Sequence, residues 1–350
     1  TTGSITVNAG GGNDIVNLSD AAGAGTVSIT GGDGDDTLNL ITTMVGNGFT
    51  YAGGNGTDTL DMTGVDQDLS ALTITLSGVD VIQMDHASSD VVEASLLSGT
   101  SITVKGDGTV TDLLGATETT ASQTIDMSNV VIDNTLSTGL GGLAITTANG
   151  TNTVTGTSAN DTITGGTGDD TLRGGAGNDT LTGNNSIDTI SGGAGNDTLV
   201  ASSGNDVYSG DAGNDTVSFT KTLLAANSGT TATFDGGVGT DIILISDTGA
   251  TIVDADFRGI SSFETFTTGG GTNSVTLGVN ADGVGIKTFN GGSGADTINA
   301  SDIDFDNALT VTVGAGADSV QLNSANAVVD TIVIGKGEGV ASSASSITGT

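Results

Sequence analysis

The feature that most constrains this chain is a period of nine residues over residues 148–220, here called the tandem block. One register of this period is acidic or amide: Asn152, Asp161, Asp170, Asp179, Asp188, Asp197, Asp206 and Asp215. The register two residues further on is apolar or aromatic: Val154, Ile163, Leu172, Leu181, Ile190, Leu199, Tyr208 and Val217. A short fixed period predicts a stack of identical small units, each of which contacts its neighbours.

Each unit reads as a glycine-rich turn followed by a very short strand. The turn is cleanest in the hexads 174–179 and 192–197, which read GGAGND. Glycine supplies positive φ angles, and a strand such as 180–182 points its middle side chain inward. Two units then make one coil of about 18 residues, and parallel hydrogen bonding stacks the coils over a thin apolar core. The sequence predicts an all-β parallel solenoid with at most one or two short helices.

The charge of the chain predicts a bound cation. There are 41 acidic and only 6 basic residues, a formal net charge of −35, so a compact form repels itself. The available ligands are hard oxygens, since the chain has no Cys and a single His, and such a set favours Ca²⁺ over zinc or copper. A single Asp–Gly hexad is also compatible with a solvated turn, but eight hexads in phase favour a metal.

The units resemble the calcium-binding nonapeptide G-G-x-G-x-D-x-U-x of RTX (repeat-in-toxin) proteins. The resemblance is tight over the tandem block and elsewhere is limited to isolated turns. It implies a right-handed parallel β-roll, in which the Asp carboxylate and the turn carbonyls of one coil share a Ca²⁺ with the next coil. Several ions are expected per chain.

The flanks predict wider coils of the same kind. Hexads at 31–36 and 53–58 place Asp36 and Asp58 22 residues apart, as are Asp296 and Asp318, so residues 1–86 are expected to form 22-residue rungs. Residues 87–147 are interpreted as irregular β structure with a short helix at 90–99, and residues 221–350 as irregular solenoid with isolated calcium turns. Five Phe residues of 221–290 are expected to fill a wider core: Phe234, Phe257, Phe263, Phe266 and Phe289.

The expected metal-binding residues are the turn Asp and Gly residues of these hexads. They are Asp14, Gly31, Asp33, Asp36, Gly53, Asp58, Asp161, Gly165, Gly168, Asp170, Gly174, Gly177, Asp179, Gly192, Gly195, Asp197, Asp206, Gly210, Gly213, Asp215, Gly236, Asp241, Gly291, Asp296 and Asp318. Asp188 is left out, because its turn, GNNSID, lacks the second and third glycines of the motif and is expected to be strained. Asn273, in place of Asp, is expected to bind calcium weakly.

The residue types argue against catalysis, nucleic-acid binding and membrane insertion. The only His, His86, is interpreted as a plain surface residue, so neither a zinc protease nor a serine hydrolase site can be assembled. Chance pairs among 41 acids leave a glycosidase open, but the absence of Trp removes the usual sugar-stacking surface. Six scattered basic residues cannot neutralise a phosphate backbone, and no apolar run is long enough for a membrane helix.

Two functions remain. The chain resembles calcium-dependent RTX S-layer proteins, which implies a self-assembling coat or adhesin at the bacterial cell surface, exported by type I secretion, with other copies of itself as partners. A surface polysaccharide, bound through a segment outside this chain, is a second partner compatible with that resemblance. The alternative is a passive RTX module that folds after secretion and serves an enzyme or toxin domain. A start at Thr1 without Met is compatible with a fragment of a longer protein.

Overall fold

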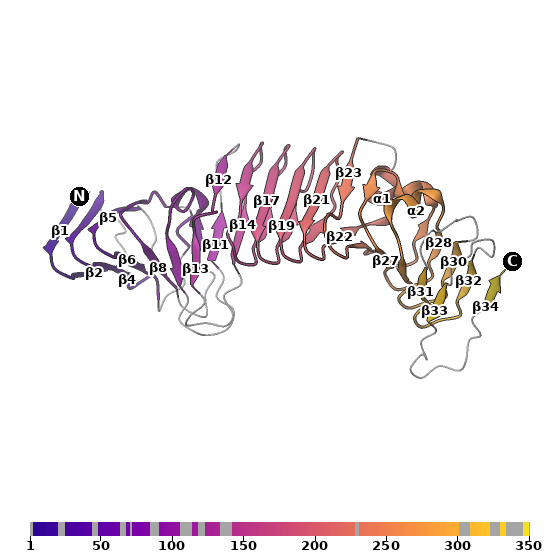
Figure 1. Ribbon diagram of the computed structural model, residues 1–350. Helices are drawn as coiled ribbons and strands as arrows, with labels where there is room; N and C mark the ends of the chain where they lie inside the picture. The colour runs from indigo at the N-terminus through magenta and orange to yellow at the C-terminus, as the bar shows by residue number, and fades with distance from the viewer. Residues whose placement is uncertain are drawn as a thin grey trace. The chain divides into compact units, whose positions relative to one another are not determined.

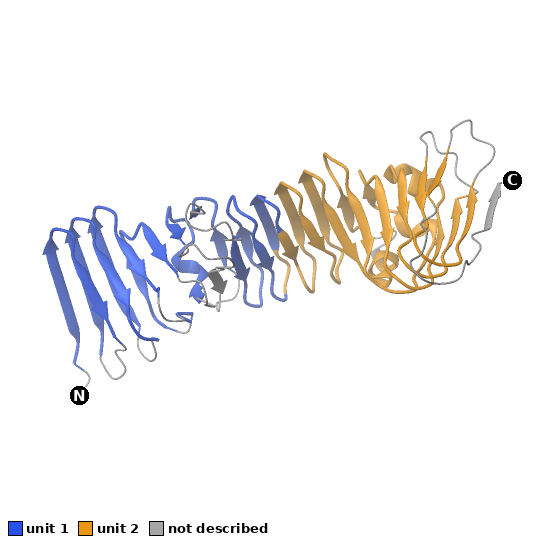
Figure 2. Ribbon diagram, turned by 90° about the horizontal axis from the view of Figure 1, so that it is seen from below, with its two compact units in different colours: residues 1–167, 171–179 blue, residues 168–170, 180–350 orange. Residues whose placement is uncertain are grey.

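The computed structural model describes residues 3–19, 25–43, 48–63, 68–70, 72–84, 91–105, 114–117, 123–133, 142–227, 231–300, 309–322, 330–333 and 346–349. The chain has two compact units, residues 1–167 with 171–179 and residues 168–170 with 180–350 (Figure 2). In both units short strands stack in parallel ladders, as Figure 1 shows for successive coils. The predicted all-β parallel solenoid is confirmed.

The first unit is built from four groups of parallel strands. Partner residues in its N-terminal coils lie 22 positions apart, as in Ile5–Val27 and Val27–Phe49, whereas Val154 and Leu172 are 18 apart. The first two groups are β1 (Ile5–Gly11), β3 (Val27–Asp33), β5 (Phe49–Asn55) and β7 (Thr75–Ser77), and β2 (Ile15–Leu18), β4 (Thr37–Leu40), β6 (Thr59–Asp61), β8 (Val81–Gln83), β10 (Thr103–Lys105) and β13 (Val131–Asp133). The others are β9 (Val91–Glu93), β11 (Leu114–Thr117), β14 (Leu143–Thr146) and β16 (Thr162–Thr164), and β12 (Thr124–Asp126), β15 (Thr153–Thr155) and β17 (Thr171–Ala176).

The second unit has three groups of parallel strands, because its later coils gain a third side. The longest group is β18 (Thr180–Thr182), β20 (Thr198–Val200), β22 (Thr216–Phe219), β24 (Ile242–Ile245), β27 (Thr265–Thr268), β29 (Thr288–Asn290), β31 (Thr310–Thr312) and β33 (Thr331–Val333). The second is β19 (Thr189–Ala194), β21 (Val207–Ala212), β23 (Thr233–Asp235) and β26 (Ile260–Ser261). The third is β25 (Thr251–Ile252), β28 (Ser274–Thr276), β30 (Thr297–Ala300), β32 (Ser319–Leu322) and β34 (Ser346–Gly349).

The core is a set of inward rows in which equivalent side chains stack from coil to coil. In the second unit one such row is Leu181, Leu199, Val217, Ile243, Phe266, Phe289 and Val311, which pair consecutively from Leu199 to Val311 and are all buried. The five Phe residues of the wider coils are all at most 2% exposed, which confirms their predicted place in the core. Tyr208 stacks on Phe234 with ring centroids 4.9 Å apart.

Helices are short and few in the described residues. The α-helices are α1 (Lys221–Asn227) and α2 (Val279–Val284), and there are 3₁₀ turns at η1 (Ala94–Leu96) and η2 (Asp254–Phe257). The helix expected at 90–99 is limited to η1, because Val91–Glu93 pairs with β11 as a strand. Within the described residues no helix is both long and apolar enough to cross a membrane.

Candidate calcium turns

The turns of successive coils are tied together by their sixth residue. A carboxylate oxygen of that residue accepts the backbone N–H of the equivalent residue one coil earlier. In the N-terminal coils Asp36 N–H donates to Asp58 Oδ1 at 2.9 Å, and in the second unit Asp215 N–H donates to Asp241 Oδ1 at 2.7 Å. The same bond joins Asp14 to Asp36, Asp161 to Asp179, Asp170 to Asp188, Asp188 to Asp206, Asp197 to Asp215, and Asp296 to Asp318. One carboxylate oxygen is therefore used for coil stacking.

The second carboxylate oxygen is buried and faces other oxygens. Oδ2 of Asp36, Asp58, Asp188, Asp215, Asp241 and Asp296 has no hydrogen-bond donor among the described residues. These six Asp residues are at most 2% exposed. A buried ionised carboxylate without a partner is strongly unfavourable, so a turn of this kind requires a cation or a proton. We call these six turns the open turns.

Glycine at the first position of an open turn leaves room for this oxygen. A Cβ on Gly210 would overlap both Asp215 Oδ2 and the carbonyl oxygen of Gly236 in the next coil, and a Cβ on Gly31 would overlap Asp36 Oδ2 in the same way. Gly53, Gly192, Gly236 and Gly291 stand in the equivalent place beside Asp58, Asp197, Asp241 and Asp296. The fourth-position glycines Gly168, Gly177, Gly195 and Gly213 have φ between 111° and 145°. A carboxylate and carbonyls thus converge where only glycine fits.

This arrangement fits Ca²⁺, which takes several oxygen ligands from carboxylates and backbone carbonyls. A cation bound there would supply the positive charge that the converging oxygens lack. No group of three or more acidic, His or Cys side chains converges among the described residues, so the cradle depends on backbone carbonyls for most of its oxygens. That is the oxygen set predicted from the sequence.

Several expected ligands are placed differently from the open-turn Asp residues. Asp161 Oδ2 accepts the N–H of Thr157 at 2.5 Å and its hydroxyl at 3.0 Å, both from its own turn. Asp206 Oδ2 accepts the hydroxyls of Ser202 at 3.3 Å and Tyr208 at 3.2 Å. Asp33 is exposed and accepts the side-chain amide of Asn55 on the outer rim at 2.8 Å. We call the turns of Asp161 and Asp206 the internally bonded turns.

Four acidic residues that are not among the expected ligands also occupy the sixth-position geometry, although two of them, Asp80 and Asp188, fall in the 22-residue and nine-residue registers of the sequence. Asp188 belongs to an open turn because Asn184 and Ser186 adopt φ of 78° and 91° in place of glycine. Glu264 accepts the N–H of Asp241 at 2.9 Å through Oε2, Asp80 accepts that of Asp58 at 2.9 Å, and Asp330 accepts that of Leu309 at 3.1 Å. An acidic residue two positions before an inward apolar residue is their common signal, as in Glu264 and Phe266.

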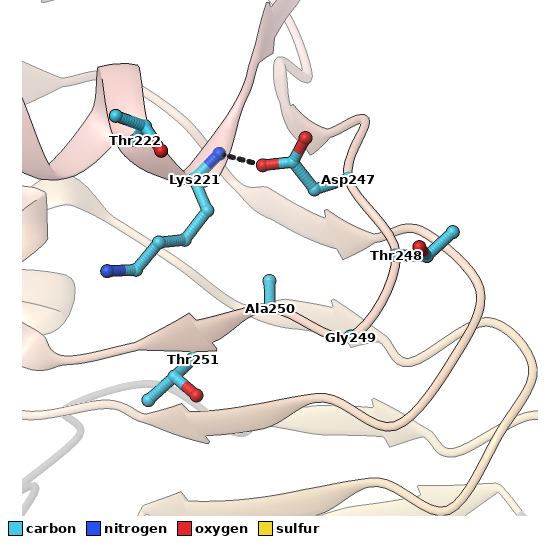
Figure 3. A pocket seen from close by; sticks show the side chains of 7 residues that line it. All are labelled: Lys221, Thr222, Asp247, Thr248, Gly249, Ala250 and Thr251. Carbon is cyan, nitrogen blue, oxygen red and sulfur yellow. Dashed lines mark hydrogen bonds between the residues drawn. The ribbon is translucent and has the colours of Figure 1, made fainter.

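A concavity of about 440 Å³ lies in the second unit (Figure 3). It is lined by Lys221, Thr222, Asp247, Thr248, Gly249, Ala250 and Thr251. Asp247 Oδ2 accepts the backbone N–H of Lys221 at the start of α1, so this carboxylate fixes the helix. His86, interpreted as a surface residue, lies outside the described residues.

Five carboxylates of the open turns have raised pKa values, those of Asp58, Asp188, Asp215, Asp241 and Asp296. Burial, and secondarily the neighbouring carboxylates of Asp206, Asp170 and Asp169, raises the pKa of Asp188 to about 7. Burial, together with the neighbouring carboxylates of Asp197, Asp241 and Asp211, also raises the pKa of Asp215 to about 7. Protons therefore compete with a cation for these turns near neutral pH.

This competition gives a pH prediction. Because the folded pKa lies above the value of about 3.9 for an unfolded Asp, the cation-free fold binds more protons than the unfolded chain between these values and loses stability as pH rises toward 7. In protein freed of calcium on a chelating resin, β structure measured by circular dichroism should be greater at pH 5 than at pH 8, and the calcium midpoint should be at least about 10-fold higher at pH 5.5 than at pH 8. A calcium midpoint independent of pH would contradict the prediction.

Comparison with known proteins agrees with this geometry. The family model of the RTX calcium-binding nonapeptide repeat matches four copies, at residues 21–40, 146–181, 182–217 and 288–302. Two of these matches cover the tandem block, and the other two fall in the flanks, at turns that include Asp36 and Asp296. None of the curated proteins matches the chain. This chain therefore contains RTX calcium-binding nonapeptide repeats, and such repeats bind several Ca²⁺ ions.

Proposed function

We propose that this calcium-dependent protein is structural, and that it self-assembles into a bacterial surface coat of the S-layer type or acts as an adhesin. The observation that carries the proposal is the extent of the calcium-type turns. Open turns occur well outside the tandem block, at Asp36 and Asp58 on one side and at Asp241 and Asp296 on the other. A passive folding module is normally mostly tandem repeat, whereas here the irregular coils of the flanks are longer than the block.

The surface charge supplies a reason for calcium-dependent assembly. Beyond the buried turn residues, the coils carry exposed acids such as Asp35, Asp169, Asp211 and Asp235, within a net charge of −35. Two such surfaces repel each other at contact distance unless divalent ions lie between them. Calcium would then act twice, first by closing the turns and then by bridging copies.

The proposed location follows from the same chemistry. RTX repeats are typical of secreted proteins, and calcium is submicromolar in the cytosol but abundant outside the cell. An acidic chain that folds only on meeting calcium suits export by type I secretion, after which the ion supplies folding free energy. We assign the chain no catalytic role, no nucleic-acid partner and no membrane insertion. A surface polysaccharide is a further candidate partner, through a segment outside this chain.

Assembly can be tested directly. In millimolar Ca²⁺, light scattering should show an increase in particle mass, and electron microscopy should show ordered sheets or filaments, while Mg²⁺ at the same concentration should give neither. Magnesium is the matched control because it demands a small octahedral shell and gives up water reluctantly. A folded monomer at every calcium concentration would favour the passive module over the coat.

A further inference from the structure

In two turns of the solenoid, the first and the sixth residue of the calcium motif are both substituted. Residues 147–152 read TANGTN and residues 268–273 read TGGGTN, so each begins with Thr where open turns have Gly and ends with Asn in place of Asp. They lie in different units, and all four end residues are at most 6% exposed. We call them the Thr–Asn turns.

The side-chain amide of Asn273 is surrounded by the oxygens that a calcium turn would offer to its ion. Nδ2 donates to the carbonyl oxygens of Gly269 and Gly271 at 3.0 Å each, and it lies 2.9 Å from Asp296 Oδ1. Oδ1 accepts the N–H of Ala250 at 2.9 Å, which is the coil-stacking bond that Asp Oδ1 makes elsewhere. These partners fix the orientation of the amide, because only NH₂ can face three acceptors.

Asn152 repeats this arrangement independently in the first unit. Its Nδ2 donates to the carbonyl oxygens of Ala148 and Gly150 at 2.9 Å each, which are again the second and fourth residues of the turn. Its Oδ1 accepts the N–H of Gln123 at 3.0 Å. The coincidence of both carbonyl positions in two units shows that the geometry belongs to the turn type.

The hydroxyls of Thr147 and Thr268 provide further hydrogen-bond donors at the first position of each Thr–Asn turn. In an open turn the next coil's carbonyl points at the first-position glycine, as Gly236 O does at Gly210. In the Thr–Asn turn the Thr268 hydroxyl occupies this place and donates to Gly291 O at 3.0 Å. The Thr147 hydroxyl donates to Thr164 O at 3.5 Å and accepts from Asn152 Nδ2 at 3.3 Å. In the turn 268–273 each oxygen that would face a cation thus faces an uncharged donor, and in the turn 147–152 the two carbonyl oxygens of the turn itself do so.

We propose that the Thr–Asn pair takes the place of the calcium ion, so that the turns 147–152 and 268–273 are closed without metal. The amide NH₂ satisfies the carbonyls of its own turn and the hydroxyl satisfies the carbonyl of the next coil, and neither leaves a buried charge to neutralise. The inference holds whether or not the protein assembles, since it concerns which turns take an ion.

The position of these turns gives them a role in folding. Asn273 precedes Asp296 and Asp318 in one carboxylate column, and Asn152 is the first residue of the nine-residue acidic register. A coil that closes without calcium provides a template on which calcium-dependent coils can stack, in the manner of nearest-neighbour solenoid folding. The metal-free turns therefore mark where ordered structure persists when calcium is scarce.

The experiment converts one turn type into the other in the full chain. Thr268→Gly/Asn273→Asp restores the first and sixth residues of the calcium motif. It should bind one more Ca²⁺ per chain than the parent by calorimetric titration, and in EGTA its Tm should fall by roughly 5 °C. The single variant Thr268→Gly is the control, which should gain no ion. A folded double variant with the parent's calcium stoichiometry would overturn the proposal.

The converse change keeps the test decisive if that variant does not fold. Asp215→Asn and Asp215→Ala should each lose one Ca²⁺, but the Asn variant should retain more β structure in EGTA than the Ala variant, because only Asn can donate to the turn carbonyls. Equal loss of β structure for both, measured by circular dichroism and hydrogen exchange of residues 207–217, would overturn the proposal.

Discussion

In EGTA at neutral pH the tandem block after its Thr–Asn turn, residues 153–220, is expected to lose its β structure and to regain it when Ca²⁺ is restored. The open turns each bury a carboxylate oxygen without a donor, and the chain carries a net charge of −35. A ligand present at 100 times its Kd stabilises the folded state by about 2.7 kcal/mol per site. The six open turns together supply a stabilisation comparable with the roughly 5–15 kcal/mol that holds an ordinary domain together, so the fold depends on them.

Circular dichroism during an EGTA titration measures this transition, and hydrogen exchange locates it. Amides next to open turns, such as those of residues 186–191 and 207–217, should exchange rapidly in EGTA. Amides around the Thr–Asn turns should retain more protection. A complete β spectrum without calcium, unchanged by millimolar Ca²⁺, would show that the fold is not linked to the cation.

The second large effect concerns how much Asp188 and Asp161 each contribute to calcium binding. We expect Asp188 to contribute more, which is the reverse of the order expected from the sequence. Asp188→Ala should remove one bound Ca²⁺ and reduce the calcium-dependent gain in stability by about 2–3 kcal/mol. Asp161→Ala should leave the calcium-dependent gain almost unchanged, because Thr157 already satisfies the Asp161 carboxylate. Asp161→Ala instead lowers stability to a similar extent with and without calcium, since those internal hydrogen bonds are lost.

Unfolding by urea at several calcium concentrations separates the two effects. The slope of stability against the logarithm of calcium concentration should fall for Asp188→Ala and stay at the parent value for Asp161→Ala. From the sequence, Asp161 was expected to be a ligand and Asp188 was left out, although both turns, GTSAND and GNNSID, start with Gly and lack the second and third glycines of the motif. Equal slopes for the two variants would contradict the distinction between open and internally bonded turns.

Most of the fold could be predicted from the sequence because the same turn and strand pattern repeats along the chain. The inward residues of the nine-residue register, such as Leu172 and Leu199, are fully buried, and the strands between turns pair in parallel. The third side of the later coils, formed by β25, β28, β30, β32 and β34, was not predicted. The sequence between its strands has no fixed period, so these strands could not be located from a repeat.

The site was harder to predict because the motif specifies positions and not hydrogen-bond partners. Asp33 lies on the outer rim because of a contact with Asn55 in the neighbouring coil, and Asp206 accepts a hydrogen bond from the hydroxyl of Tyr208 in its own coil. Asp188 was left out because glycine was taken as essential, whereas Asn184 and Ser186 adopt positive φ there. Asn tolerates the left-handed region better than most residues, and the cost at Ser186 is of the order of 1–3 kcal/mol.

The most direct measurement is a crystal structure grown in calcium with the anomalous signal of the ion recorded. Peaks should lie beside Oδ2 of Asp36, Asp58, Asp188, Asp215, Asp241 and Asp296, within the 2.3–2.6 Å typical of calcium–oxygen bonds. The turns ending at Asn152 and Asn273 should show none. A peak enclosed by Gly269 O and Gly271 O, or the absence of peaks beside Asp188 and Asp215, would contradict the assignment of calcium to open turns.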